Sequence, residues 1–477
     1  MFLGSGGEYF NLILEGNFSS PCWNDYPHCN LLYPFPGAWN LNHSPVRDFF
    51  IGLSRTITTG HNDGDFYIWS CIWNSCWDAS KMPSPQVFAA ASFLSSIFGA
   101  LAVVCAYGIG KVLYSRMAGL FFSLILLFNS MWLWNSRGIM QEIYLGFFSL
   151  LCLFLLFYSF KNETTKKWTF VLSAVVLGLL FNIKLISIYL LPLILTTILL
   201  RVPHNKQFPY LTSLPSRKSI LLLMLFVSVS LATTYATEPS YWKDVTYPIS
   251  DIVKGFRVHY PFFSAPSLDN NNLFTTLATI HSTIIPYFVN YYDQPNKSAP
   301  NLSWNAPGTY SSIPVMIFFM VGIVYLCIRF KTKKATYAEF LMTVWVSSIF
   351  VLSSLTIVDF QMERYYLLLL FPIMLVSAYG VWRFLERLDK KIHLVLFGSF
   401  LISHILTTMV FWKYIYFSTG VRWLNPLGVN LQSALQHKSV IISSIIFVII
   451  FIIILSYKVR INARSRTKDQ AQYQQPS

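Results

Sequence analysis

Long, nearly uncharged apolar runs alternate along the chain with short polar clusters, which is the pattern of a series of membrane-spanning helices. Such a helix needs about 20 mostly apolar residues, because hydrocarbon cannot satisfy unpaired backbone groups. Windows of this kind lie at 86–109, 113–135, 142–160, 168–182, 185–200, 219–237, 313–329, 336–357, 364–382, 393–413 and 438–457. We therefore predict an all-α integral membrane protein with about 11 transmembrane helices.

The basic residues between these runs predict how the chain is oriented in the membrane. Lys and Arg gather in every second connection, as the positive-inside rule expects if residues 1–85 lie outside. The short windows 168–182 and 185–200 could instead form one helix, but merging them would place the later basic clusters outside. We therefore expect two separate spans, an external amino terminus and a cytoplasmic tail at 458–477, in the cell membrane or, in a eukaryote, the endoplasmic reticulum membrane.

Two long segments, 1–85 and 238–312, are predicted to be large external loops with short interfacial helices, because they are rich in Pro, Asn, Trp and Tyr. They flank transmembrane core helices at 86–237 and carboxyl-terminal ones at 313–457. Because an exported first loop with no span before it is unusual, we expect a first membrane helix to be missing from this chain. Two disulfides and free thiols are both compatible with the four cysteines of the first loop, Cys22, Cys29, Cys71 and Cys76.

The composition excludes a soluble enzyme and a nucleic-acid-binding protein. Of the 477 residues, 54% are hydrophobic and 12% are charged, whereas soluble domains carry roughly 25% charged residues. The mean hydropathy is +0.50. The net charge of +15 comes from basic residues between apolar runs, without a basic helix or an aromatic-basic sheet pattern. The excess positive charge therefore indicates how the chain is oriented in the membrane.

Charged side chains also stand at the predicted outer ends of several spans, where they are costly unless they have a function or reach into the headgroups. Arginine at headgroup level can hold a phosphate through two parallel hydrogen bonds. Interfacial anchoring explains the same positions, and spacing alone leaves both interpretations open. The residues concerned are Arg137, Glu142, Lys184, Arg364 and Tyr365.

The order of the motifs resembles the dolichyl-phosphate-mannose protein mannosyltransferase family and its relatives that transfer sugars from polyprenyl phosphate. In that superfamily a His-Pro-Pro motif precedes an amphipathic helix, and a Gly-containing helix pair, a Ser-Arg-x4-Asp/Glu turn, a Gly-x5-Lys turn and an Arg-Tyr before a Pro follow. The similar residues here are His43-Ser44-Pro45 with Phe49–Leu53, Tyr107–Leu120, Ser136 with Arg137 and Glu142, Gly178 with Lys184, and Arg364-Tyr365 with Pro372.

This resemblance implies transfer of a mannose-like sugar, with inversion, from a polyprenyl-phosphate donor to a protein or lipid acceptor on the outer face. It implies that Arg137 and Arg364 hold the phosphate. The substrate-binding residues that it implies are His43, Arg137, Glu142, Lys184, Arg364 and Tyr365.

The catalytic base is the point at which the sequence departs from the family. Family members carry an Asp-Glu pair whose acid is taken to be the base, but no Asp stands beside Glu8 here. Either this copy is inactive or Glu8 substitutes, with Glu15 and Asp48 as alternatives. No cluster of metal-ligating residues in the sequence requires a metal ion, and the question of a divalent ion as a cofactor stays open.

Two rival classes predict different features. A transporter or lipid flippase should carry charges buried in the middle of its spans and inverted repeats. The sequence shows no inverted repeat, and its ionisable residues cluster at span ends, with His404 and Lys184 as the few exceptions. A catalytically degenerate copy that acts as a membrane scaffold fits the absent Asp-Glu pair.

Overall fold

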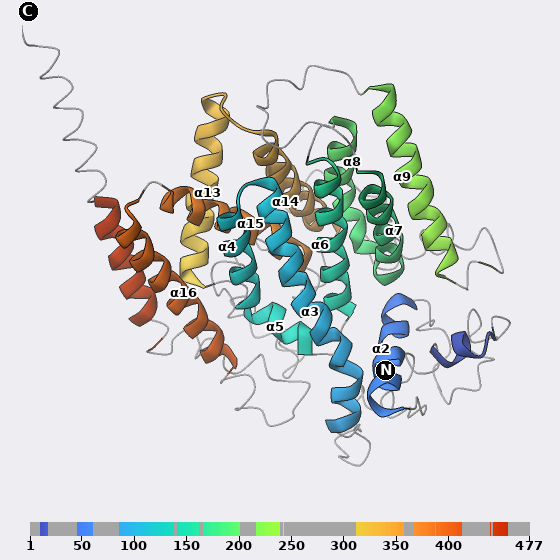
Figure 1. The fold of residues 1–477 in the computed structure, drawn as a ribbon. Coiled ribbons are helices and arrows are strands. Elements are labelled where there is room, and N and C mark those ends of the chain that lie inside the picture. Colours follow the sequence, from blue (N-terminus) through green and yellow to red (C-terminus); the bar gives the residue numbers. More distant parts are fainter. Residues whose placement is uncertain are drawn as a thin grey trace, which may run out of the picture. The chain divides into compact units, whose positions relative to one another are not determined.

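The computed structural model describes residues 10–17, 45–60, 85–137, 141–161, 166–200, 216–238, 242, 312–356, 367–386, 388–412, 439 and 442–456. In these ranges the regular structure is helical (Figure 1). The chain divides into two compact units, and each is described by itself. The first consists of 1–127, 131–283 and 326–375, and the second of 128–130, 284–325 and 376–477.

The first unit is built from helices of the amino-terminal half of the chain together with one helix, α14, of the carboxyl-terminal half. They are α2 (Pro45–Thr59), α3 (Pro85–Leu113), α4 (Arg116–Leu127), α5 (Ser130–Arg137), α6 (Gln141–Ser159), α7 (Lys167–Ile183), the 3-10 helix η6 (Leu185–Leu190), α8 (Leu191–Leu200), α9 (Arg217–Ala236) and α14 (Tyr337–Thr356). Both α13 (Ile313–Lys331) and α15 (Leu367–Leu385) contribute residues to each unit. The second unit also holds α16 (Lys390–Trp412) and the helix Ile442–Ser456.

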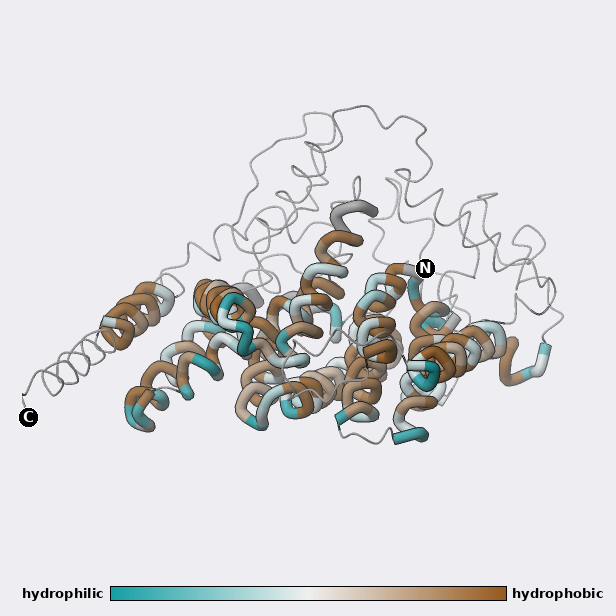
Figure 2. Tube along the Cα trace, turned by 90° about the horizontal axis from the view of Figure 1, so that it is seen from above, coloured by the Kyte–Doolittle hydropathy of each residue, from teal (hydrophilic) through white to brown (hydrophobic). Residues whose placement is uncertain are grey.

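The apolar windows predicted from the sequence are helices in the structure. Six described helices are long and apolar enough to cross a membrane, and five shorter apolar helices accompany them. Each predicted window overlaps one of them. Apolar residues run along most of these helices, and hydrophilic residues gather at their ends (Figure 2). The prediction of an all-α membrane protein is therefore confirmed.

One predicted span differs from the structure. The window 113–135 is two helices, α4 and α5, which are separated at Phe128 and Asn129. Asn and Ser favour helix caps over helix interiors, because their side chains compete for backbone hydrogen bonds. The hydroxyl of Thr408, in the same unit as Phe128, donates to the Phe128 carbonyl at the break. The apolar pattern could not reveal this break, because Met131 to Trp134 continue it.

The helices α7 and α9 run parallel, which confirms the predicted separation of the two short spans around Lys184. Near their middles Ser230 donates to the Ala174 carbonyl at 2.9 Å. Near their ends the Asn182 amide donates to the Thr237 hydroxyl at 2.8 Å. The chain between two parallel helices has to cross back once, and η6 with α8 makes that crossing. Lys184, with φ −165° and ψ 131°, is the extended residue at the turn.

Polar contacts between distant segments define two ends of the first unit. At one end, which we call the Tyr114 end, the Tyr114 hydroxyl donates to the Ala338 carbonyl at 3.1 Å, and the Tyr337 hydroxyl donates to the Thr196 carbonyl at 3.1 Å. The end of α3, the start of α14 and the end of α8 therefore meet there. Because Lys111 and Arg116 lie at this end, the positive-inside rule predicts that it faces the cytoplasm.

The opposite end, which we call the Lys184 end, joins the start of α3 to the starts of later helices. Ser95 and Tyr144 share a hydrogen bond of 3.0 Å, and the Ser96 hydroxyl donates to the Ser136 carbonyl at 3.1 Å. The starts of α3 and α6 and the end of α5 are therefore at one level, together with Lys184. By the same rule this end is predicted to be external.

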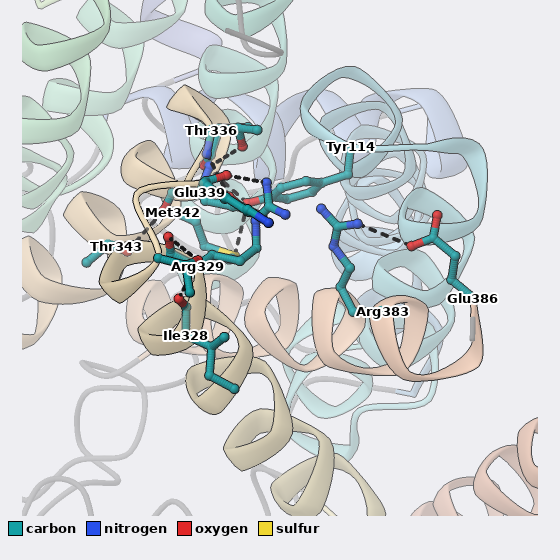
Figure 3. Close-up of polar contacts among 12 residues, drawn as sticks. Tyr114, Ile328, Arg329, Thr336, Glu339, Met342, Thr343, Arg383 and Glu386 are labelled. Atoms are coloured by element: carbon teal, nitrogen blue, oxygen red, sulfur yellow. Dashed lines mark hydrogen bonds and ion pairs between the residues drawn. The ribbon is translucent and has the colours of Figure 1, made fainter. Parts of the chain in front are cut away.

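A tight turn at the Tyr114 end connects α13 to α14 (Figure 3). The Glu339 carboxylate is fully buried, lies 2.6 Å from the Arg329 guanidinium and accepts a hydrogen bond of 2.7 Å from the Thr336 amide. The Glu339 amide in turn donates to the Thr336 hydroxyl at 3.4 Å, so the two residues form a capping box. Lys333 has a φ of 56°, which completes the turn. These contacts fix the first turn of α14 beside Tyr114.

The backbones of α3 and α4 touch, which leads to a stability prediction. A Cβ on Gly119 would collide with the Tyr107 carbonyl and lie 2.9 Å from the Lys111 nitrogen, whereas a Cβ on Gly398 would meet nothing within 4 Å. We expect Gly119→Ala to lower the free energy of unfolding by about 2 kcal/mol, because backbone cannot move aside as a flexible side chain can. The control Gly398→Ala should be neutral or stabilising by up to about 1 kcal/mol. Equilibrium unfolding in detergent micelles measures both, and equal effects would contradict the prediction.

Candidate functional site

The amphipathic helix predicted at Phe49–Leu53 is confirmed and is longer than predicted. It is α2, and it begins at Pro45, a residue suited to the first turn of a helix because its ring fixes φ and its missing N–H is not needed there. Arg47, Ile51 and Arg55 recur every four residues and are all buried. Two arginines therefore share the buried face of this helix with an aliphatic residue.

Aromatic and hydroxyl contacts attach α2 to the Lys184 end of the first unit. The Phe50 ring stacks on the Tyr144 ring of α6, with 5.7 Å between centroids and 8° between planes. The Ser54 hydroxyl donates to the Ala90 carbonyl of α3 at 2.5 Å and accepts a 3.2 Å hydrogen bond from the Leu94 amide. These contacts hold α2 beside α3 and the start of α6 (Figure 1).

The best-defined polar contact at this end joins Glu142 to Lys184. The Lys184 ammonium donates to the Glu142 carboxylate at 3.2 Å, with relative side-chain exposures of 15% and 1%. Glu142 lies in the first turn of α6, where the helix dipole favours a negative charge. Lys184 follows the last residue of α7. The buried carboxylate thus positions an ammonium that solvent or a ligand can still reach.

Arg137 ends α5 at the same level. Its side chain is exposed, and the preceding Ser136 is buried, with its backbone carbonyl bound to Ser96 at 3.1 Å. Gly99 provides the space for this packing, because a Cβ there would lie 2.6 Å from the Ser136 Cβ. The α3–α5 contact therefore fixes the backbone from which Arg137 extends. Glu142, five residues after Arg137 in the sequence, forms its ion pair with Lys184 at 3.2 Å.

A second ion pair lies on α2. The Arg47 guanidinium is 2.5 Å from the Asp48 carboxylate, and both side chains are buried. Phe50 of the same helix stacks on Tyr144 at 5.7 Å, so this pair is on the helix that packs against the start of α6. Asp48, the sequence alternative for the catalytic base, is therefore engaged with an arginine.

The site carries more positive than negative charge. Its described cations are Arg47, Arg55, Arg137 and Lys184, and its described carboxylates are Asp48, Glu142 and Glu238, the buried residue after α9, which leaves a surplus of one positive charge. A positive surplus at the end of a helix bundle suits an anion such as a phosphate diester. In the described ranges, no three His, Cys, Asp or Glu side chains gather in a way that could hold a metal ion.

Several predicted residues lie outside the described ranges, so their roles stay predictions. They are Glu8, His43, Arg364 and Tyr365 and the cysteines of the first loop. The sequence analysis missed the Arg47–Asp48 pair and Arg55 as members of the site. The signal that could have found them is the spacing of four between Arg47, Ile51 and Arg55, which puts both arginines on one helical face.

Residues 86–232 match the family model described as dolichyl-phosphate-mannose-protein mannosyltransferase. This match confirms the resemblance to the mannosyltransferase superfamily. The matched segment begins in α3 and ends in α9, and it includes Arg137, Glu142 and Lys184. No curated protein sequence matches the chain.

Solved structures of membrane glycosyltransferases are similar to the chain at low identity. The Archaeoglobus fulgidus oligosaccharyltransferase tethered with an acceptor peptide shares 12% identity at a TM-score of 0.47, over 80% of this chain and 50% of that one. ArnT from Cupriavidus metallidurans bound to undecaprenyl phosphate shares 12% identity at a TM-score of 0.43, over 86% of this chain and 65% of that one. The chain thus spans between half and two thirds of the length of these structures, and the low TM-scores carry no functional conclusion.

Proposed function

We propose that this protein is a membrane glycosyltransferase that moves a mannose-like sugar from a polyprenyl-phosphate donor to a protein or lipid acceptor at the Lys184 end. The observation that carries the proposal is the Glu142–Lys184 ion pair of 3.2 Å. It lies within the segment that matches the family. A buried carboxylate there holds a reachable ammonium at the end of two apolar helices, where the phosphate of a membrane-embedded lipid would lie.

In the proposed reaction a carboxylate takes the proton of the acceptor hydroxyl, whose oxygen attacks the anomeric carbon. The bond between that carbon and the phosphate oxygen breaks, and polyprenyl phosphate leaves with the electron pair. The Lys184 ammonium and the Arg137 guanidinium offset the charge that develops on the leaving phosphate. Arg364 and Tyr365 as further phosphate contacts, His43 as a polar contact and Glu8 as the base are carried over from the resemblance.

The positions of the buried charges favour this proposal over a transporter. A transport path requires ionisable groups inside the membrane-spanning part. In the described part of the chain, the buried Asp, Glu and Arg side chains lie on α2 or at helix ends. They are Arg47, Asp48, Arg55, Glu142, Glu238 and Glu339. A histidine, His404, is buried inside α16, where its ring shares a hydrogen bond of 2.9 Å with the Ser312 hydroxyl.

Replacing Lys184 tests the proposal. The full chain in phosphatidylcholine nanodiscs receives radiolabelled polyprenyl-phosphate mannose and a mixture of peptide and lipid acceptors, and labelled acceptor is counted. We expect transfer by the unaltered protein and a loss of at least about tenfold in Lys184→Gln, because one stabilising cation is removed from the leaving group. Lys184→Arg should keep most of the activity, because the positive charge remains.

Lys167→Gln is the matched control, because Lys167 is exposed at the opposite end of α7. It should transfer as the unaltered protein does. A thermal unfolding midpoint for each variant separates loss of transfer from loss of folding. Donor binding without transfer to any acceptor would contradict the proposal and favour a degenerate copy, and equal losses at Lys167 and Lys184 would remove the role of Lys184.

A further inference from the structure

Three lysines surround one tyrosine at the Tyr114 end of the first unit. The Lys166 ammonium donates to the Tyr158 hydroxyl at 2.7 Å and lies 4.0 Å from the centroid of its ring. The Lys161 amide donates to the Tyr158 carbonyl at 3.4 Å. Lys111 lies in the last turn of α3, which packs at Gly108 against Phe154 of α6, the ring next to Tyr158. Tyr158 is in the last turn of α6 and Lys166 precedes α7, so with Lys111 on α3 three segments contribute to one group, which we call the Tyr158 cluster.

The Tyr158 cluster has a large surplus of positive charge. Its three lysines are exposed. Residues 161–167 of the sequence contain three lysines and one acidic residue. Like charges that are held together in this way repel one another, and a bound anion relieves the repulsion. The cluster therefore has the charge of an anion site rather than of an ion-pair network.

The surroundings of the cluster are those of a membrane boundary. Ile97, Leu101 and Val104 form an exposed apolar stripe on α3, at exposures of 40%, 42% and 63%. Lys111 stands seven residues, or about two turns, after Val104 and so lies on the same face of α3, which means that the stripe leads toward the cluster. On α7 the Trp168 side chain is 87% exposed beside Lys166, which suits the headgroup level that tryptophan prefers. A ligand that fits both parts has an anionic head and apolar tails.

We propose that the Tyr158 cluster binds the headgroup of an anionic phospholipid, with the acyl chains along the exposed stripe of α3. The lysine ammoniums and the Tyr158 hydroxyl donate to the lipid phosphate. The cluster is at the opposite end of the bundle from Lys184, so this lipid is not the sugar donor. The inference does not depend on the proposed transfer reaction.

Lipid binding to the full chain tests the proposal. The protein in neutral detergent is titrated with dioleoyl phosphatidylglycerol, and bound lipid is counted by native mass spectrometry. Dioleoyl phosphatidylcholine, which has the same tails, and water-soluble glycerol 3-phosphate are titrated in parallel. We expect at least about tenfold tighter binding of phosphatidylglycerol than of either, because a lysine near an anionic lipid surface contributes about a fivefold preference.

The lysine variants show whether the lipid binds at the Tyr158 cluster or at any group of lysines at this end of the bundle. Replacing Lys111, Lys161 and Lys166 by Gln should weaken phosphatidylglycerol binding about tenfold or more. The control variant replaces three lysines at the same end by Gln, Lys331, Lys333 and Lys334, and so changes the net charge equally. It should weaken binding by less than about twofold. Equal losses of phosphatidylglycerol affinity in the two variants would overturn the proposal, because the attraction would then come from the net charge of the protein. Equal affinity for glycerol 3-phosphate and phosphatidylglycerol would show that the ligand is not a lipid.

A variant that does not fold is recognised by its thermal unfolding midpoint, and Tyr158→Phe then provides the second test. It keeps the ring beneath Lys166 and removes only the hydroxyl. We expect phosphatidylglycerol binding to weaken about threefold in this variant, as for the loss of one modest hydrogen bond. Unchanged binding would contradict the role of the hydroxyl at the centre of the cluster.

Discussion

Replacing Glu142 by leucine is expected to lower the free energy of unfolding by about 3 kcal/mol. The substitution removes the partner of a largely buried ammonium, because Lys184 is 15% exposed and lies 3.2 Å from the carboxylate. The double replacement Glu142→Leu with Lys184→Met should recover most of this loss, because it leaves no unpaired charge and fills the same space. Equilibrium unfolding in mixed detergent micelles measures all three variants.

A second ion pair in the same chain provides the control for Glu142. Arg383 and Glu386 also lie 3.2 Å apart (Figure 3), but the Glu386 side chain is 50% exposed. Solvent screens this pair, so Glu386→Leu should cost less than about 1 kcal/mol. If the two leucine variants lose the same free energy of unfolding, burial is not the reason that the Glu142–Lys184 ion pair stabilises the fold.

Replacing Arg137 by alanine is expected to lower sugar transfer about 100-fold or more, because a positioned donor to a charged leaving group contributes on that scale. Arg137→Lys should recover only part of the rate, since lysine keeps the charge and loses the planar pair of donors. The measurement is the same nanodisc assay, with donor affinity determined separately.

Arg116→Ala is the matched control for Arg137. Both arginines are exposed, and they stand at opposite ends of the α4–α5 segment, Arg116 as the first residue of α4 and Arg137 as the last residue of α5. The control should transfer at the unaltered rate. Because Arg137 is exposed, its replacement should leave the unfolding midpoint unchanged. Full transfer by Arg137→Ala would contradict its role as a phosphate contact.

The helices could be predicted from the sequence because the membrane imposes one strong physical requirement on every spanning segment. A spanning segment has to be helical and apolar, so the windows of about 20 residues identify it without knowledge of its neighbours. The same physics explains why α4 and α5 were predicted as one span. The break at Asn129 depends on local capping, which hydropathy does not measure.

The candidate site was only partly predictable. The sequence singled out Arg137, Glu142 and Lys184 as charges at span ends, which is a property that can be read along the chain. It did not indicate that Glu142 pairs with Lys184, which is 42 residues later. It also left Arg47 unnoticed, because a charged residue on a short helix is ordinarily solvated.

The sequence by itself determined that this is a multi-pass helical membrane protein, since the cost of backbone and charge in hydrocarbon is set by each segment alone. It also determined, through the segment 86–232, the resemblance to the mannosyltransferase superfamily. Only the tertiary structure decided that α7 packs against α9 and which carboxylate holds Lys184. Those contacts arise from the packing of helices that are far apart in the chain, and helix packing depends on the fit of whole faces, which no single segment contains.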